Sequence, residues 1–283
     1  MAPSTNTREP GPHTRTAAVR GIDVRYADHG SGHPVLLVHG HPFDHTLWHP
    51  QIPTLADHGY RAIAPDLRGY GHSTVVQGTT SLATFARDLC ALLEHLQIPA
   101  VSVVGTSMGG QIALELYRLF PDRIDSLTLV ATDPRPESPQ GQERRHQMAD
   151  RLAREGMQGY ADEMIVGMMS ADNVRTMAPT AARVHTMMCQ APPEGAAAAL
   201  RGRAQRPDHL GLLRHISAPA LLVVGDQDDF TPPDLTEAMH LKIADSVVAR
   251  IDGAGHTPNL ERTEAFDRAL LSFLERVRAD LRP

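Results

Sequence analysis

Residues 101–116, with the sequence VSVVGTSMGGQIALEL, decide the fold of this chain. A run rich in β-branched residues predicts a strand, and apolar residues at spacings of three and four then predict a helix with one buried face. Between them, GTSMG at 105–109 matches the nucleophile elbow G-x-S-x-G in its strand, turn and helix setting. So tight a turn strains the serine backbone and excludes bulky neighbours, a need that glycine meets. We predict that Ser107 is a nucleophile; a glycine-rich turn without chemistry is the alternative.

The same alternation of strands and helices continues along most of the chain. A hairpin is predicted in AVRGIDVRYADHG (18–30), and helical periodicity recurs in SLATFARDLCALLEHLQ (81–97). Further apolar runs predict strands, namely PVLLVHG (34–40), YRAIAPD (60–66), SLTLVAT (126–132), ALLVVGD (220–226) and SVVARIDG (246–253). Near-continuous apolar strands separated by helices indicate a mostly parallel α/β sheet that is covered on both faces.

This alternation stops between residues 133 and 210, where the chain is helical and rich in methionine. We predict a helical cap insertion at 133–210 between two parts of one core, 17–132 and 211–283, and a flexible N-terminal tail at 1–16. Ligands of such sheets bind outside the carboxyl ends of the strands. The insertion is therefore expected to roof the site.

Composition excludes several kinds of partner. The 283 residues are 41% hydrophobic, and 27 basic against 33 acidic residues give a net charge of −6 with no block of one sign, so no nucleic-acid partner is expected. No run has the length of a membrane span or the character of a signal peptide, so no membrane partner and a cytoplasmic location are expected. Cys90 and Cys189 lack the spacing of a metal site or disulfide framework. No metal or organic cofactor is implied, and homo-oligomer formation is left open.

A serine hydroxyl needs an adjacent base, and histidine has the ordinary pKa that suits this role. The chain contains 16 histidines, so position must decide among them. His256 follows the predicted strand SVVARID and the flexible turn GAG, which would let the imidazole reach the elbow. A carboxylate is then needed to orient the histidine. Three candidates follow the strand ALLVVG, namely Asp226, Asp228 and Asp229.

Taken together, five motifs resemble those of the α/β-hydrolases, and the resemblance extends from about residue 20 to the end. Besides the elbow, VLLVHGHP (35–42) resembles the HGxP loop of that family and DLRGYGHS (66–73) its DxRGxGxS loop. GDQDDFTPP (225–233) resembles the acid loop and GAGHTPNLE (253–261) the histidine loop. The resemblance implies an eight-stranded α/β-hydrolase fold with a catalytic triad. The family's G-x-x-D spacing, counted from Gly225, selects Asp228 to act with Ser107 and His256.

The resemblance also implies an oxyanion hole made by the backbone N–H groups of His41 and Met108. Pro42 has no N–H, which agrees with His41 as the donor. The HGxP loop removes His39 and His41 from the candidates for the base. The His41 side chain is expected either to form a pocket wall or to contact the substrate. We expect His72, His95 and His215 to be ordinary surface or loop residues.

A serine nucleophile forms an acyl-enzyme, so a small-molecule ester, thioester or lactone is the expected substrate. Among family members, the chain resembles the lactonases that open 3-oxoadipate enol-lactone and related esterases. A dicarboxylic lactone would require cationic side chains, and the insertion offers Arg135, Arg144, Arg145, Arg183 and Arg201. A hydrophobic group could instead be received by Met157, Met164, Met168, Met169, Met177, Met187 and Met188. Solvated helix faces and core packing are the alternatives, and the two features point to different substrates.

Two other functions fit the same motifs. The HGxP loop and the elbow also resemble those of cofactor-free haloperoxidases, in which the triad performs perhydrolysis. A ligand receptor on the hydrolase fold is a further alternative, because a fold by itself does not determine function.

Overall fold

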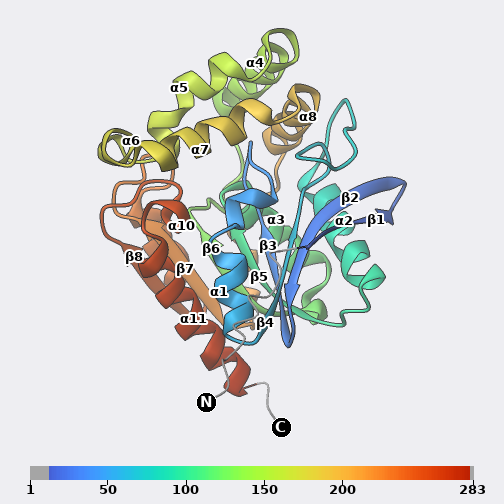
Figure 1. The fold of residues 1–283 in the computed structure, drawn as a ribbon, viewed down its shortest axis with the longest axis vertical. Helices are drawn as coiled ribbons and strands as arrows, with labels where there is room; N and C mark the ends of the chain where they lie inside the picture. The colour runs from blue at the N-terminus through green and yellow to red at the C-terminus, as the bar shows by residue number, and fades with distance from the viewer. Residues whose placement is uncertain (1–12, 281–283) are drawn as a thin grey trace, which may run out of the picture.

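An eight-stranded sheet forms the centre of the computed structural model, which describes residues 13–280 (Figure 1). The strands lie in the order β1-β2-β4-β3-β5-β6-β7-β8. β1 and β2 pair antiparallel, as do β2 and β4, and the remaining neighbours pair parallel. The predicted mostly parallel eight-stranded sheet is confirmed. Its strands are β1 His13–Val19, β2 Ile22–Gly30, β3 His33–Val38, β4 Tyr60–Pro65, β5 Val101–Thr106, β6 Ile124–Val130, β7 Ala220–Gly225 and β8 Ser246–Ile251.

Helices cover both faces of this sheet (Figure 1). Successive side chains of a strand point to opposite faces, so each inner strand supplies two cores. In β3, Leu36 and Val38 belong to one core, whereas Val35 and Leu37 belong to the other. The first core includes α2 (Leu82–His95) and α3 (Met108–Leu119), and the second includes α1 (Gln51–Asp57) and α11 (Thr263–Asp280). Shorter elements are η1 His45–Trp48, η2 Pro121–Arg123, η3 Leu212–His215, α9 Pro233–His240 and α10 Pro258–Glu261. Within residues 13–280, no helix combines the length and the apolar character needed to cross a bilayer.

Five helices between β6 and β7 lie over the carboxyl ends of the strands and are called the cap (Figure 1). They are α4 (Pro139–Glu155), α5 (Gln158–Met168), α6 (Ala171–Thr176), α7 (Ala178–Gln190) and α8 (Pro193–Ala204). Two glycines bring α8 against the backbone of core loops. A Cβ on Gly195 would lie 1.8 Å from the carbonyl oxygen of Gly69, and one on Gly202 would lie 1.8 Å from that of Thr80. This close approach packs α8 against the loop between β4 and α2.

The N-terminal hairpin is also present, but it begins earlier than predicted. β1 and β2 are joined by Arg20 and Gly21, both with positive φ. Residues 13–16, which we assigned to the tail, belong to β1, and the Arg25 guanidinium donates to the hydroxyls of Thr14 and Thr16. Polar residues suit this strand because it lies at the edge of the sheet. The rest of the predicted tail, residues 1–12, lies outside the described residues.

Candidate active site

The turn between β5 and α3 holds Ser107 in the backbone conformation that the elbow requires. Its φ of 52° and ψ of −114° are strained for a residue with a Cβ. A Cβ on Gly105 would lie 2.3 Å from the carbonyl oxygen of Gly109, and one on Gly109 would lie 2.2 Å from that of Val38. The glycines of the motif are therefore steric requirements. The turn is tied to β6, because the Ser107 N–H donates to the Val130 carbonyl at 2.8 Å.

The loops after β7 and β8 bring Asp228 and His256 together. Nδ1 of His256 lies 2.9 Å from Oδ2 of Asp228, and both residues are buried. The backbone N–H groups of Phe230 and Thr231 donate to Oδ1 of Asp228 at 2.9 and 3.0 Å. Burial alone would raise the pKa of Asp228, but the charge of His256 and the hydrogen bonds from His256 and Thr231 lower it overall. The other two candidates, Asp226 and Asp229, are exposed.

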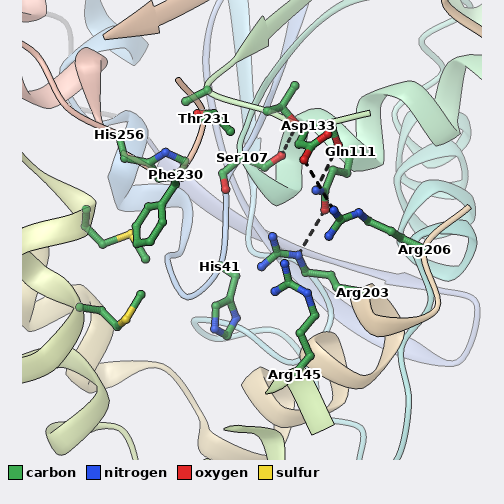
Figure 2. Close-up of a pocket in the computed structure, with 14 residues that line it drawn as sticks. His41, Ser107, Gln111, Asp133, Arg145, Arg203, Arg206, Phe230, Thr231 and His256 are labelled. Carbon is green, nitrogen blue, oxygen red and sulfur yellow. Dashed lines mark hydrogen bonds and ion pairs between the residues drawn. The ribbon is translucent and has the colours of Figure 1, made fainter. Parts of the chain in front are cut away.

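Ser107 and His256 border one cavity of about 210 Å³ beneath the cap (Figure 2). Among residues 13–280, no direct hydrogen bond joins their side chains. The ring of Phe230 packs edge-on against the His256 imidazole, with 5.1 Å between the ring centroids, and borders the same cavity. The base candidate and the nucleophile candidate therefore face a common space that could hold a small substrate.

The two predicted oxyanion donors come from two different segments, the loop after β3 and the start of α3. Met108 is the first residue of α3, where a backbone N–H has no acceptor within the helix and the helix dipole is positive. His41 is buried and its side chain borders the cavity. Its Nδ1 lies 2.8 Å from the Tyr70 hydroxyl. Burial, followed by the charges of Arg203 and Arg145, holds the pKa of His41 well below 6.5, so its ring is neutral.

The other competing histidine has a structural role. Nδ1 of His39 lies 2.9 Å from the Gly40 carbonyl oxygen, and its Nε2 accepts the Leu67 N–H at 2.9 Å. Both nitrogens are thus used in fixing the loops after β3 and β4. His72, His95 and His215 are exposed, as predicted.

Comparison with known proteins identifies the family. The family model for the alpha/beta hydrolase fold matches residues 33–263. The chain belongs to the α/β-hydrolase fold family. Its matched region includes the elbow, the acid loop and the histidine loop.

Relatives of this α/β-hydrolase are named for several different activities. A non-heme chloroperoxidase from Kitasatospora aureofaciens is 30% identical over 90% of this chain and 97% of its own. A 3-oxoadipate enol-lactonase from Acinetobacter baylyi is 26% identical over 92% of this chain and 96% of its own. Among solved structures, a malate-bound thermophilic esterase from Thermogutta terrifontis is 38% identical, with a TM-score of 0.90 over 94% of this chain and 99% of its own.

The cap of the hydrolase contributes to the cavity one cation that the sequence suggested and two that it did not. Of the five arginines considered, Arg145 borders the cavity with Ser107. The others are engaged elsewhere: Arg135 pairs with Asp133, Arg183 donates to the Thr46 carbonyl, Arg201 pairs with Asp150, and Arg144 borders a neighbouring hollow. Of the seven methionines, Met164 and Met168 border the cavity.

Several cavity residues were not predicted, chiefly Gln111, Asp133, Arg203, Arg206, Phe230 and Thr231. One signal was available for Arg203, because it lies in the last turn of a helix made mostly of alanine and glycine, on which Arg201 is the only other cation. A cation on a helix of such small residues is a candidate for a functional role, but this pattern does not distinguish Arg203 from Arg201. Nothing comparable distinguished Arg206, which lies in the loop that follows.

One group of side chains has the composition of a metal site. Ligand atoms of Asp44, His45 and Asp66 lie within 4.8 Å of one another. Oδ1 of Asp66 accepts from the His45 backbone N–H at 2.8 Å and lies 2.6 Å from its Nδ1, and Oδ2 accepts from the His72 N–H at 2.9 Å. Oδ1 of Asp44 caps η1 through the Thr46 N–H at 2.8 Å. These oxygens are used in holding the loops together.

Proposed function

We propose that this protein is a serine hydrolase that cleaves a carboxylic ester or lactone through an acyl-enzyme. Ser107 is the nucleophile, His256 the general base and acid, and Asp228 the group that orients the histidine. The observation that carries the proposal is the shared cavity of an elbow serine and a histidine bound through Nδ1 to a buried carboxylate. The esterase and enol-lactonase names among its relatives support it.

In this mechanism, Nε2 of His256 takes the hydroxyl proton while Ser107 Oγ attacks the carbonyl carbon. The serine–histidine hydrogen bond that this step needs can form as substrate binds, since such bonds tighten in the reacting complex. The Asp228 carboxylate accepts from Nδ1–H and stabilises the imidazolium that forms. The N–H groups of Met108 and His41 stabilise the oxyanion, and the start of α3 adds its positive dipole end.

The second half of the reaction reverses the proton path. His256 gives its proton to the leaving alkoxide, which departs as an alcohol and leaves the acyl group on Ser107. The imidazole then takes a proton from water, whose oxygen attacks the acyl-enzyme. The tetrahedral intermediate collapses to the carboxylic acid, and His256 returns the proton to Ser107.

The test compares Ser107→Ala with Ser272→Ala, an exposed position on α11, on 4-nitrophenyl acetate. We expect kcat/KM to fall by about 10³-fold or more in the first variant and to stay near wild type in the second, with both proteins folded by circular dichroism. A fluorophosphonate should label the wild type and Ser272→Ala but not Ser107→Ala. Retention of most activity by Ser107→Ala contradicts the proposal.

Perhydrolysis is a second candidate because a 30% identical relative is named a non-heme chloroperoxidase. Hydrogen peroxide would replace water in attacking the acyl-enzyme, releasing a peracid and free Ser107, and the peracid would oxidise bromide. This path requires a carboxylic acid as co-reactant. Bromination by peroxide that does not depend on added acetate excludes it, and rapid multiple turnover of an ester excludes a receptor.

A further inference from the structure

Three guanidinium groups of the cap meet at one wall of the cavity (Figure 2). Arg145 comes from α4, Arg203 from the last turn of α8, and Arg206 from the loop after α8. In Figure 2 they lie on one side of Ser107, and His256 and Phe230 lie on the other. The cavity therefore has a cationic side and a side formed by the histidine and an aromatic ring.

The protein supplies too few carboxylates to this cationic side. Glu137 accepts from both Arg145 and Arg206, the latter at 2.6 Å. Asp133 is 3.8 Å from Arg206 and is already bound through both oxygens by Arg135. Arg203 has no carboxylate within 4.0 Å among residues 13–280, and its Nε donates a hydrogen bond to the Gln111 amide oxygen at 3.2 Å.

Arg203 is nevertheless charged. Burial, followed by the positive charges of Arg145 and Arg206, lowers the pKa of Arg203 to about 9, which is still well above neutral pH. A partly buried cation without a counter-charge destabilises a folded protein. An anion in the cavity would remove this penalty, and a carboxylate matches the planar guanidinium fork.

His41 adds an unused group to the same wall. Its Nε2 is buried and has no hydrogen-bond partner among the described residues. Burial raises the pKa of Tyr70 far above its usual value, so the phenol keeps its proton and can donate to Nδ1 of the neutral His41 ring. That arrangement leaves the hydrogen on Nε2, which is then a donor for a substrate oxygen.

The cavity also has apolar lining. Phe230 packs on the His256 ring, and Met164 and Met168 border the cavity as well. Because His256 must protonate the leaving alkoxide, the alcohol part of an ester has to lie on the histidine side. The acyl part then extends to the cationic side. A volume of about 210 Å³ is below the ~300–1,000 Å³ of sites for drug-sized ligands, so the substrate is small.

On this basis we infer that Arg203, with Arg145 and Arg206, forms a carboxylate subsite, and that the substrates are half-esters of small dicarboxylic acids. The second carboxylate belongs to the acyl part, and the alcohol is small and apolar. This inference rests on the proposed function, because it assigns the two halves of the substrate from the proton path through His256.

The kinetic test uses monoethyl glutarate and ethyl valerate, which differ by a carboxylate in place of a terminal methyl group. We expect the wild type to favour monoethyl glutarate by at least about ten-fold in kcat/KM, and Arg203→Met to lower that ratio by about 10- to 100-fold, chiefly through KM. The matched control is Arg201→Met, on the same helix but paired with Asp150, which should keep the ratio. A wild type that favours ethyl valerate, or a ratio unchanged by Arg203→Met, overturns the subsite.

The orientation of the substrate in the cavity is tested separately with the valeryl ester of glycolic acid, which carries the carboxylate on its alcohol part. We expect it to be a poorer substrate than monoethyl glutarate. An equal or better kcat/KM contradicts the assignment of the carboxylate to the acyl part.

A binding test separates this inference from the proposed chemistry. Saturating glutarate should raise the melting temperature of wild type and of Ser107→Ala by about 2–4 °C, valerate should raise it less, and Arg203→Met should lose the difference. Arg203→Met should itself melt no lower than wild type, because an uncompensated cation has been removed; a lower melting temperature indicates a structural role instead. If Ser107→Ala stays active yet glutarate still binds, the proposed mechanism fails and the subsite stands. If glutarate does not bind and Ser107→Ala is inactive, the subsite fails and the proposed mechanism stands.

Discussion

Oε2 of Glu261 accepts a hydrogen bond from the backbone N–H of Gly255 at 3.0 Å. Its Oε1 accepts from the N–H of Thr257 at 3.1 Å, so one buried carboxylate binds both neighbours of His256. Oε2 also accepts from the Ser170 N–H at 2.9 Å and from the Asn173 side chain at 2.7 Å. Glu261 therefore joins the histidine loop to the cap, and the position of the imidazole depends on it.

Glu261→Gln should disturb this loop. An amide has one acceptor oxygen, and its NH₂ group would face N–H donors that are buried, leaving them without partners. We expect the free energy of unfolding to fall by about 1–3 kcal/mol, with a lower kcat, as measured by urea unfolding and ester hydrolysis. Glu264→Gln, at an exposed position, is the control and should change stability by less than about 0.5 kcal/mol. Equal effects of the two changes contradict the role given to Glu261.

The stability that Asp228 contributes should disappear in acid. Its pKa in the folded protein is lowered from 3.8 by the charge and hydrogen bond of His256 and by Thr231, against the effect of burial. The unfolded chain therefore binds the proton first as the pH falls. The contribution is complete above the unfolded pKa and is lost as the pH drops through the folded one.

The measurement is the difference in unfolding free energy between wild type and Asp228→Asn from about pH 5 to about pH 3, which should shrink towards the acid end. Asp229→Asn, at an exposed position in the same loop, should show no such trend. At neutral pH, Asp228→Asn should also lower kcat by roughly 10²–10⁴-fold. If the difference in unfolding free energy grows in acid, the pKa of Asp228 is raised on folding and not lowered, which contradicts the prediction.

Because the elbow is sterically crowded, the addition of one methyl group at Gly109 should strongly destabilise the fold. Gly109→Ala places a Cβ 2.2 Å from the Val38 carbonyl oxygen, and a backbone atom cannot move aside as the end of a flexible side chain can. We expect destabilisation of about 3 kcal/mol and loss of activity, measured by thermal melting and ester hydrolysis. Gly211→Ala, where a Cβ meets nothing within 4 Å, should leave both near wild type.

Phe230 should affect substrate choice more than stability. The residue is 43% exposed and lies against His256, on the side assigned to the alcohol. Phe230→Ala should reduce kcat/KM for benzyl acetate by about ten-fold, mainly by raising KM, while melting stays near wild type. Leu241→Ala, at a position that is 86% exposed and does not border the cavity, should leave the KM unchanged. An equal loss for methyl acetate indicates that Phe230 instead supports the His256 ring.

The local sequence pattern was sufficient to predict the sheet and the elbow. β5, the turn at Ser107 and α3 are encoded within one short segment, because strand propensity, glycine sterics and helical periodicity all act between neighbouring residues. The same reasoning failed at residues 13–16, where an edge strand has the polar composition of a tail. It also left three carboxylates after β7 as candidates for the group that orients the histidine. The resemblance to the family selected Asp228 among them by spacing alone.

Sequence by itself determined the α/β architecture, the strained serine and the candidates for its partners. Tertiary structure decided which carboxylate meets His256 and which cations reach the cavity. Arg201 and Arg203 stand two residues apart on α8, so about 100° of rotation per residue sends them to opposite sides of the helix. The packing of Gly195 and Gly202 against core loops helps to set the rotation of α8 that leaves Arg203 on the side of the cavity. Such a rotation depends on contacts between segments more than 100 residues apart, which no local pattern encodes.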